Sequence, residues 1–256
     1  MHKLTAIIPV KNEVHNIEAV LESVKWCDEI LVVDSYSTDA TVELAKKYTD
    51  RIIQSEYVNS ASQKNRAIPL AKYEWILLVD ADERVTPELK NEIEQILSSD
   101  KIEYDAFWIY RKNYFMGVEI RYSGWQNDKV IRLFKRDTSR YEEKHVHAEV
   151  KTSGKTGKLK NKLVHYTFKD ILHYLEKLDR YSTWSAEDAA KKNVHPNLFH
   201  FVIKPRFRFF KHYFLKLGIL DGYPGFIISA LSAQSVLMRY IKLYDMQHDG
   251  NNKPRQ

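Results

Sequence analysis

Cysteine is nearly absent from the sequence, since Cys27 stands alone among 256 residues. A single cysteine excludes a disulfide within the chain and a zinc site made of cysteine ligands. The apolar stretch "KLTAIIPV" starts within a few residues of Met1, which leaves no room for a signal peptide. We therefore expect a protein of the cytosol or of the cytosolic face of a membrane.

Glycine-rich phosphate loops are also missing. No G-x-G-x-x-G follows the first apolar stretch, so the usual fingerprint of dinucleotide binding is absent. The piece "GKTGK" lacks the G-x-x-x-x-G-K-[ST] spacing and does not predict a phosphate loop.

The chain offers little for a transmembrane helix. The range Gly222 to Met238 carries no charge over 17 residues, whereas spanning a bilayer takes about 20 apolar residues. This range also contains Pro224, Gln234 and three serines. We expect a helix that lies in the membrane interface or packs on the domain.

Positive charge is concentrated in the C-terminal quarter. Residues 196–256 hold nine Lys or Arg and three Asp, while the first 195 residues hold 31 charges of each sign. Between Lys204 and Lys216, five basic side chains alternate with aromatic ones. Such a segment suits anionic lipid headgroups better than nucleic acid, because no nucleic-acid module precedes it. The plainer alternative is a solvated helical face with core aromatics.

The most informative stretch is Trp75 to Arg84, "WILLVDADER", a short apolar run that ends in acids. A run of this length is typical of a strand buried on both faces, as in a parallel sheet. Asp80 and Asp82 then fall at the carboxyl end of the strand, where open α/β sheets bind ligands. Two carboxylates at this spacing can converge on Mg²⁺ and leave positions for phosphate oxygens. The alternative is a solvated acidic turn before the helix that Thr86 starts.

Strand and helix patterns alternate through the first hundred residues, as in a doubly wound sheet with right-handed crossovers. After Asp100 we expect aromatic-rich strands, turn-rich segments and a long helix from Asp170. Hydrophobic content of 44% and charged content of 29% are those of an ordinary globular protein. The expected early strands cover residues 4–10, 29–34, 51–55 and 75–79, and the helices cover 17–24, 41–48, 60–71 and 89–97.

Three of these strands end at the same edge of the sheet, at Pro9-Val10, Asp34 and Asp80. They deliver polar residues to that edge. That edge is the place for a nucleotide. Asp34 could accept hydrogen bonds from a base or ribose, and the acids after the fourth strand could hold a metal under a diphosphate.

The ordered motifs "AIIPVKNE", "EILVVDSYSTDAT" and "WILLVDADE" resemble the family 2 glycosyltransferases, which have the GT-A fold. The later "RLF", "VH", "HY" and "GILDGYPGF" segments resemble the branch that adds sugars to the lipopolysaccharide inner core. The resemblance implies an α/β fold with a mostly parallel, Rossmann-like sheet flanked by helices, and a C-terminal helical, basic-aromatic extension. We expect a nucleotide-sugar-binding, catalytic domain over residues 1–168 and a helical, membrane-associating region over residues 169–256.

The resemblance also implies a divalent cofactor, Mg²⁺ or Mn²⁺. Asp80 and Asp82 match the metal motif, with Asp82 as the direct ligand. Among later histidines, His147 is favoured over His145 and His165 as a further ligand, although a loop histidine is more often structural. The donor-binding positions of the family are matched by Pro9, Asn12, Glu13, Asp34, Ser37, Lys64 and Asp80.

Enzymes of this kind usually invert the anomeric centre, which requires a carboxylate base to deprotonate the acceptor hydroxyl. Asp128, in "GWQNDKVIRLF", matches the acid of the branch. The branch often has Glu directly after "VH", but Ala148 stands there in this chain, so Glu149 is a shifted second candidate. Trp125 is either core packing or the floor of a sugar site.

These expectations describe an inverting hexosyltransferase that moves a hexose, with glucose as first candidate, from a UDP-sugar to a lipid-linked glycan such as the lipopolysaccharide core. The enzyme would be peripheral on the cytosolic face of the inner membrane, with an anionic membrane surface but no nucleic acid as partner. Two alternatives stay open: a non-catalytic nucleotide-sugar sensor, and a sugar-phosphate nucleotidyltransferase.

Overall fold

The protein is described from a computed structural model that covers residues 2–142, 149–168 and 171–248. The chain divides into two compact units. The first comprises residues 1–112 and 128–165, and the second comprises residues 113–127 and 166–256.

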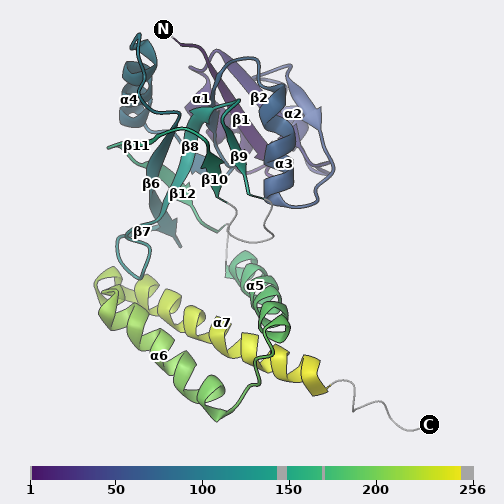
Figure 1. Cartoon of the computed structure of the whole chain (residues 1–256), viewed down its shortest axis with the longest axis vertical. Coiled ribbons are helices and arrows are strands. Elements are labelled where there is room, and N and C mark those ends of the chain that lie inside the picture. The colour runs from purple at the N-terminus through teal and green to yellow at the C-terminus, as the bar shows by residue number, and fades with distance from the viewer. Residues whose placement is uncertain (1, 143–148, 169–170, 249–256) are drawn as a thin grey trace, which may run out of the picture. The chain divides into compact units, whose positions relative to one another are not determined.

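The first unit is built on a parallel core of four strands (Figure 1). They are arranged in the order β3-β2-β1-β4, so consecutive strands are joined by crossovers. All four were predicted from their apolar runs, and the predicted α/β fold is confirmed. Their bounds are β1 Leu4–Val10, β2 Glu29–Asp34, β3 Ile52–Gln54 and β4 Trp75–Leu78.

Both faces of this parallel core are covered, because successive side chains of a strand point to opposite faces. Ala6 and Ile8 belong to one buried cluster with α1, α2 and α4, while Ile7 belongs to another with α3. A two-stranded sheet of β9 and β10 also contributes to the second cluster. The bounds are α1 Ile17–Val24, α2 Thr41–Ala45, α3 Ser60–Ala67, α4 Pro87–Ser98, β9 Ser139–Tyr141 and β10 Val150–Thr152.

Local sequence explains where the helices start. Asn59 caps α3, with its side-chain oxygen accepting from the Ser62 amide at 2.8 Å. Thr86 caps α4 by accepting from the Leu89 amide at 3.2 Å, and Pro87 follows at the first helical position.

The strands after residue 100 make the sheet mixed. β8 pairs antiparallel with both β4 and β6, so it lies between them and brings the middle of the sequence beside the parallel core. β11 pairs parallel with β6, and β12 pairs antiparallel with the short β5. The bounds are β5 Glu83–Arg84, β6 Ala106–Phe115, β8 Lys129–Lys135, β11 Thr156–Lys158 and β12 Leu163–Tyr166.

The second unit is mainly helical. α7 packs against α5 and α6 (Figure 1), with Ala186, Ala189, Tyr240 and Leu243 in the buried core between α5 and α7. Short π-helical and 3-10 turns flank α6. The bounds are β7 Val118–Ile120, α5 Ile171–Lys191, η2 Phe199–Ile203, α6 Lys204–Phe210, η3 Lys211–Leu215, η4 Gly218–Asp221 and α7 Gly222–His248.

Asp221 explains why residues 113–127 belong to the second unit. Its carboxylate accepts from the amides of Arg121 at 3.0 Å and Tyr122 at 3.1 Å, and from the Ser123 hydroxyl at 2.7 Å. These contacts fix the segment after β7 to the turn that precedes α7. The compact unit therefore differs from the expected region 169–256 by including residues 113–127 and 166–168.

Among the described residues, one helical segment, Gly218–His248, has the length and apolar composition to cross a membrane. It includes the uncharged range that begins at Gly222.

Candidate active site

The loops after β1 and β2 are bonded to each other at the carboxyl edge of the parallel core. The Asn12 amide donates to Ser37 Oγ at 2.9 Å, and Asn12 Oδ1 accepts from the Thr38 amide at 2.8 Å. Asn12 has a φ of +54°, in the left-handed region that asparagine tolerates better than most residues. Two predicted donor-binding residues, Asn12 and Ser37, are thus in direct contact.

Pro9 and Glu13 stand on either side of this loop. Pro9 is buried in β1 opposite Val33. The last pair between β1 and β4 joins Ile7 to Leu78, so the N–H that Pro9 lacks interrupts no ladder there. The Glu13 amide donates to Thr41 Oγ1 at 2.8 Å, which ties the loop to the start of α2.

Asp34 organises the second loop from within. It is fully buried, and its carboxylate accepts from the Ser37 amide at 3.1 Å and from the Ser37 hydroxyl. Tyr36, inside this turn, has a φ of +55° and an exposed side chain. The contact of Asp34 with a base or ribose stays a prediction.

Asp80 is held by two cations. Lys64 of α3 places its Nζ 2.7 Å from Asp80 Oδ1, and Arg132 of β8 donates to Asp80 Oδ2. Both cationic side chains are nearly buried, with 8% and 4% of their surface exposed, so water replaces little of these interactions. Tyr141 lies on the other side of both, with its ring 5.2 Å from Lys64 Nζ and its hydroxyl accepting from Arg132 Nη1 at 2.9 Å.

Glu83 continues the chain of charges. It is fully buried, and its Oε1 lies 2.8 Å from Arg132 Nη2 and 3.3 Å from Arg111 Nη1. Its other oxygen, Oε2, accepts from the Asp80 amide at 3.0 Å. Glu83 therefore bonds to the backbone of its own acidic turn and also joins two arginines from different strands.

Arg111 of β6 ends the chain on Asp128. Arg111 Nε and Nη2 donate to the two Asp128 carboxylate oxygens at 3.0 and 2.8 Å, a bidentate pair. The Arg111 amide also donates to the Asp128 carbonyl at 2.9 Å. The candidate base is thus fixed at both its backbone and its side chain.

These six side chains form a charge cluster in which three anions alternate with three cations. Burial alone would raise the pKa of Asp80, but the charges of Arg132 and Lys64, and more weakly Arg111, outweigh it and hold that pKa well below its usual range. Burial lowers the pKa of Arg132, but Asp80 and Glu83 raise it far above its ordinary value. The members of the charge cluster are Lys64, Asp80, Arg132, Glu83, Arg111 and Asp128.

Sequence reasoning found Lys64, Asp80 and Asp128 but missed Arg111, Arg132 and Glu83. The signal for Arg132 was an arginine inside an otherwise apolar buried strand, "VIRLF", because such a charge requires a partner. For Arg111 and Glu83, no spacing in the sequence indicated that they would meet.

A second pair of polar groups lies beside the acidic turn. Asp82 Oδ2 is 3.5 Å from Nε2 of His165, which β12 supplies and which is 13% exposed. Carboxylate oxygen and imidazole nitrogen suit Mn²⁺, and a site with few protein ligands also suits Mg²⁺, which keeps several waters. Within the described residues, no three His, Cys, Asp or Glu side chains are grouped as a metal site.

The two donors therefore fit a cation whose remaining positions are filled by phosphate oxygens and water. Lys64 and Arg132 engage the two carboxylate oxygens of Asp80, and a role of Asp80 as a metal ligand stays a prediction. His147 and His145 lie outside the described residues.

Two further candidates lie apart from the charge cluster. Glu149 is exposed, and its carboxylate is 3.9 Å from Lys151 Nζ. Trp125 packs edge-to-face against Phe115 at 6.2 Å within the second unit, as core packing requires.

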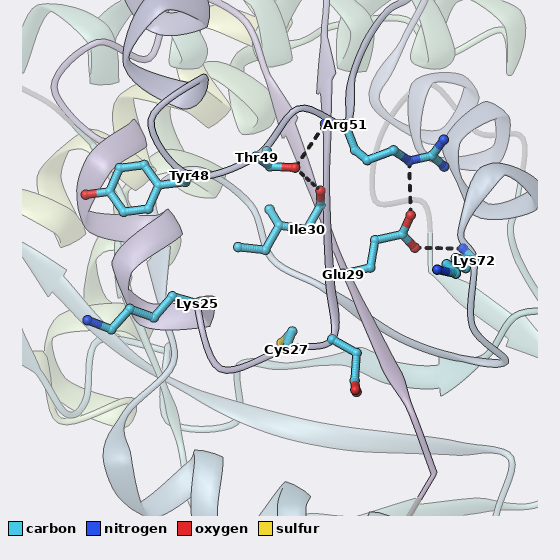
Figure 2. A pocket seen from close by; sticks show the side chains of 9 residues that line it. Lys25, Cys27, Glu29, Ile30, Tyr48, Thr49, Arg51 and Lys72 are labelled. Atoms are coloured by element: carbon cyan, nitrogen blue, oxygen red, sulfur yellow. Dashed lines mark hydrogen bonds and ion pairs between the residues drawn. The ribbon is translucent and has the colours of Figure 1, made fainter.

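A pocket of about 650 Å³ lies at the opposite end of β2 from Asp34 (Figure 2). Five residue steps of a strand separate Glu29 from Asp34, about 17 Å. Glu29 accepts from Arg51 Nε at 3.1 Å, from the Lys72 amide at 2.7 Å and from Thr5 Oγ1 at 2.7 Å. This satisfied network closes the amino end of the sheet and is not the candidate active site.

Comparison with known proteins agrees with this geometry. The family model described as Glycosyl transferase family 2 matches residues 5–153, more than half of the chain. The chain belongs to glycosyl transferase family 2. The match includes the whole charge cluster, and the prediction of this family from three strand-end motifs is confirmed.

Relatives of this family 2 glycosyltransferase extend over nearly its whole length. An uncharacterized glycosyltransferase of Rickettsia felis is 29% identical over 95% of this chain and 90% of its own. The lipopolysaccharide core biosynthesis glycosyltransferase LpsC of Rhizobium meliloti is 26% identical over 94% of this chain and 92% of its own. The crystal structure of S. aureus TarS 1–349 in complex with UDP-GlcNAc has a TM-score of 0.51 and 15% identity, covering 97% of this chain and 92% of that one. The GT-A-like fold is thereby confirmed.

Replacing Arg132 with Met should lower the free energy of unfolding by about 3–5 kcal/mol, because Asp80 and Glu83 would lose the buried cation that they share. Urea unfolding at neutral pH measures this change. The depressed pKa of Asp80 stabilises the fold above the ordinary carboxyl range near pH 4, and this share is lost as pH falls further, so the difference between wild type and variant should shrink in acid.

The matched control is Arg140→Met, which removes an exposed guanidinium that bonds to the backbone carbonyl of Ser139. It should cost less than about 1 kcal/mol. Equal losses in the two variants would contradict a special role for the buried arginine.

Proposed function

We propose that the chain is an inverting hexosyltransferase that moves a hexose, with glucose as first candidate, from a UDP-sugar to a hydroxyl of a lipid-linked glycan. The observation that supports it most is the charge cluster, which joins the acidic turn of a family 2 glycosyltransferase to a fixed carboxylate, Asp128. The likeness to LpsC supports a glycan of the lipopolysaccharide core as acceptor, and the UDP-GlcNAc complex of TarS supports a UDP-sugar as donor.

In this proposal Asp128 is the general base. Its carboxylate takes the proton of the acceptor hydroxyl while that oxygen attacks the anomeric carbon, and the bond from this carbon to the UDP oxygen breaks. Arg111 sets the orientation of Asp128, since a bidentate guanidinium fixes the carboxylate plane. The transferred sugar has an inverted anomeric centre, because the acceptor oxygen attacks from the face opposite the departing diphosphate.

The donor side uses the carboxyl edge of the parallel core. Lys64, whose Nζ is bonded to Asp80, lies at the acidic turn where it can also face a diphosphate. Asp82 and His165 would hold Mg²⁺ or Mn²⁺, and a divalent cation bound there would supply positive charge to the leaving UDP. Asn12, Glu13, Asp34 and Ser37 shape the loops around the nucleoside.

The proposed location is peripheral on the cytosolic face of the inner membrane. A lipid-linked acceptor is presented at a membrane surface, and the excess of basic residues in 196–256 favours attraction to anionic lipids.

Incubation of the protein with UDP-glucose, Mn²⁺ and a lipid extract that contains truncated lipopolysaccharide should release UDP in proportion to acceptor. The measurement is coupled detection of UDP, repeated with UDP-galactose and UDP-GlcNAc to rank donors. Formation of pyrophosphate from a sugar phosphate and a nucleoside triphosphate would identify a nucleotidyltransferase instead. Binding of UDP-sugars without any turnover across acceptors would favour the sensor.

Asp128→Asn should lower turnover by about 10²-fold and leave UDP affinity within about twofold, because it removes the base but not a donor contact. Steady-state rates and calorimetric titration with UDP measure the two quantities. Glu149→Gln, measured beside it, should keep near wild-type turnover, since Glu149 is exposed next to Lys151. Full activity in Asp128→Asn with loss in Glu149→Gln would move the base to Glu149.

Asp82→Ala should weaken UDP binding in Mn²⁺ by at least about tenfold and have little effect on the weak binding seen in EDTA. His165→Ala should act in the same direction, because both side chains are proposed to hold the cation. The matched control is Asp137→Ala, an exposed acid paired with Arg136. Unchanged Mn²⁺-dependent affinity in Asp82→Ala would exclude this pair as the metal site.

A further inference from the structure

An apolar stripe is exposed along one side of the helical segment that begins at η2 and ends before η4. Its first five members lie in the helical run of η2, α6 and η3 and recur every three or four residues, a spacing that favours one helix face. Leu217 follows the end of that run in a left-handed conformation. The exposed fractions of all six side chains lie between 45% and 58%, although five of the six are phenylalanine or isoleucine. The apolar stripe consists of Phe199, Ile203, Phe207, Phe210, Phe214 and Leu217.

The opposite side of the same segment is used for packing. Phe209 and Tyr213 lie edge-to-face against Phe226 of α7, with ring centroids 5.6 and 5.8 Å apart. Lys204 donates to the Tyr240 hydroxyl at 2.8 Å, which ties the start of α6 to the middle of α7. The inner side of the helix therefore packs against α7, and the apolar stripe takes no part in the core of the unit.

Exposed apolar side chains continue past the stripe into η4 and the first turn of α7. Leu220 is 62% exposed and Tyr223 is 88% exposed. Contiguous apolar surface of this kind on a soluble unit marks an interaction site, because leaving it in water is unfavourable.

The charges around the apolar stripe have one sign. Arg206, Arg208, Lys211 and Lys216 are exposed on the same segment. No Asp or Glu occurs in the sequence between Asp188 and Asp221. A partner must therefore combine an apolar phase with a dense negative charge.

We propose that the apolar stripe and its flanking basic residues dock the second unit on an anionic lipid bilayer, with the helix lying in the interface. The phenylalanine side chains would insert into the hydrocarbon and the cationic side chains would contact the headgroups, as in other interfacial amphipathic helices. A second copy of the chain fits poorly, because a two-fold pairing of stripes would face cations with cations and bring no carboxylate from this segment. The inference deepens the proposed function, since a lipid-linked acceptor lies in the same bilayer.

The C-terminal part of the helix that could span a membrane is bonded to α5, whereas 22% of its apolar window is buried. Lys242 of α7 donates to Asp179 Oδ1 and to Thr183 Oγ1 of α5, both at 2.6 Å. Tyr240 and Leu243 are buried against α5. These ties hold the C-terminal part of α7 on α5 and favour a helix that stays packed in the unit, so we assign attachment to the apolar stripe.

The test is co-sedimentation of the full chain with vesicles of equal parts phosphatidylglycerol and phosphatidylcholine, beside vesicles of phosphatidylcholine alone. Binding should be strong only with the anionic vesicles at low salt and should fall steeply toward about 0.5 M salt. Double charge reversal, Arg206→Glu with Arg208→Glu, should weaken it about 30-fold or more, since each basic residue contributes about fivefold. The matched control, Lys191→Glu with Lys192→Glu at the end of α5, changes the charge equally and should bind far better.

Phe207→Ser with Phe210→Ser should weaken binding about tenfold or more while leaving circular dichroism and thermal unfolding near wild type, because both rings are exposed. The inference is overturned if this variant binds as wild type, or if wild type ignores anionic vesicles at low salt. It is also overturned if wild type dimerises without lipid and the variant does not, or if only detergent releases the protein, which would make Gly218–His248 an integral segment.

UDP release from a detergent-solubilised acceptor, measured for the same variants, separates this inference from the proposed function. Loss of vesicle binding with turnover intact is the expected result for Phe207→Ser with Phe210→Ser. Vesicle binding by wild type without turnover on any acceptor would overturn the transferase and leave the docking surface standing.

Discussion

The first unit depends on one buried cation, Arg132, which is shared by the fully buried Glu83 and the half-buried Asp80. Arg132 reaches from β8 to Asp80 and Glu83, and Glu83 in turn holds Arg111. Leaving either acid without its partner would cost more than most single contacts in a domain of this size. The acidic turn, the antiparallel strand β8 and the fixed Asp128 are therefore parts of one electrostatic unit and not separate motifs.

The neutral balance within the charge cluster limits what a donor can gain from it. Three anions face three cations, so little net attraction remains for a diphosphate that carries negative charge of its own. Asp82 and His165 stand beside the cluster, with Oδ2 and Nε2 3.5 Å apart. This balance is one reason for the proposal that the donor binds together with a divalent cation.

The local pattern of apolar residues in the sequence was sufficient to predict the parallel core and its carboxyl edge. Residues 75–79 and 29–34 read as buried strands because both of their faces are apolar, and the structure has β4 and β2 there. The sequence did not show which residues far apart in the chain would contact each other. Arg132 meets Glu83 across 49 residues because β8 inserts between β4 and β6, and periodicity says nothing about the order of antiparallel strands. His165 was ranked below His147 for the same reason, since only the pairing of β12 with β5 brings it to Asp82.

The C-terminal segment shows a second limit. Composition indicated a basic-aromatic helix, but it could not separate Phe209 and Tyr213, which pack on α7, from Phe207 and Phe210, which are exposed. That separation depends on where α7 lies, and α7 is placed by Tyr240, Leu243 and Lys242 far along the chain.

The bond between Arg111 and Asp128 also has a topological meaning. The chain leaves the first unit after Lys112 and returns at Asp128, so this ion pair joins the exit strand to the entry strand. Residues 113–127 therefore form a loop whose two ends are bonded to each other within the first unit. Closing the loop in this way lowers the conformational entropy that residues 113–127 lose when they fold. The aspartate proposed to accept a proton is thus also the residue that closes this loop, so a substitution at Asp128 would affect both the proposed base and the closure of residues 113–127.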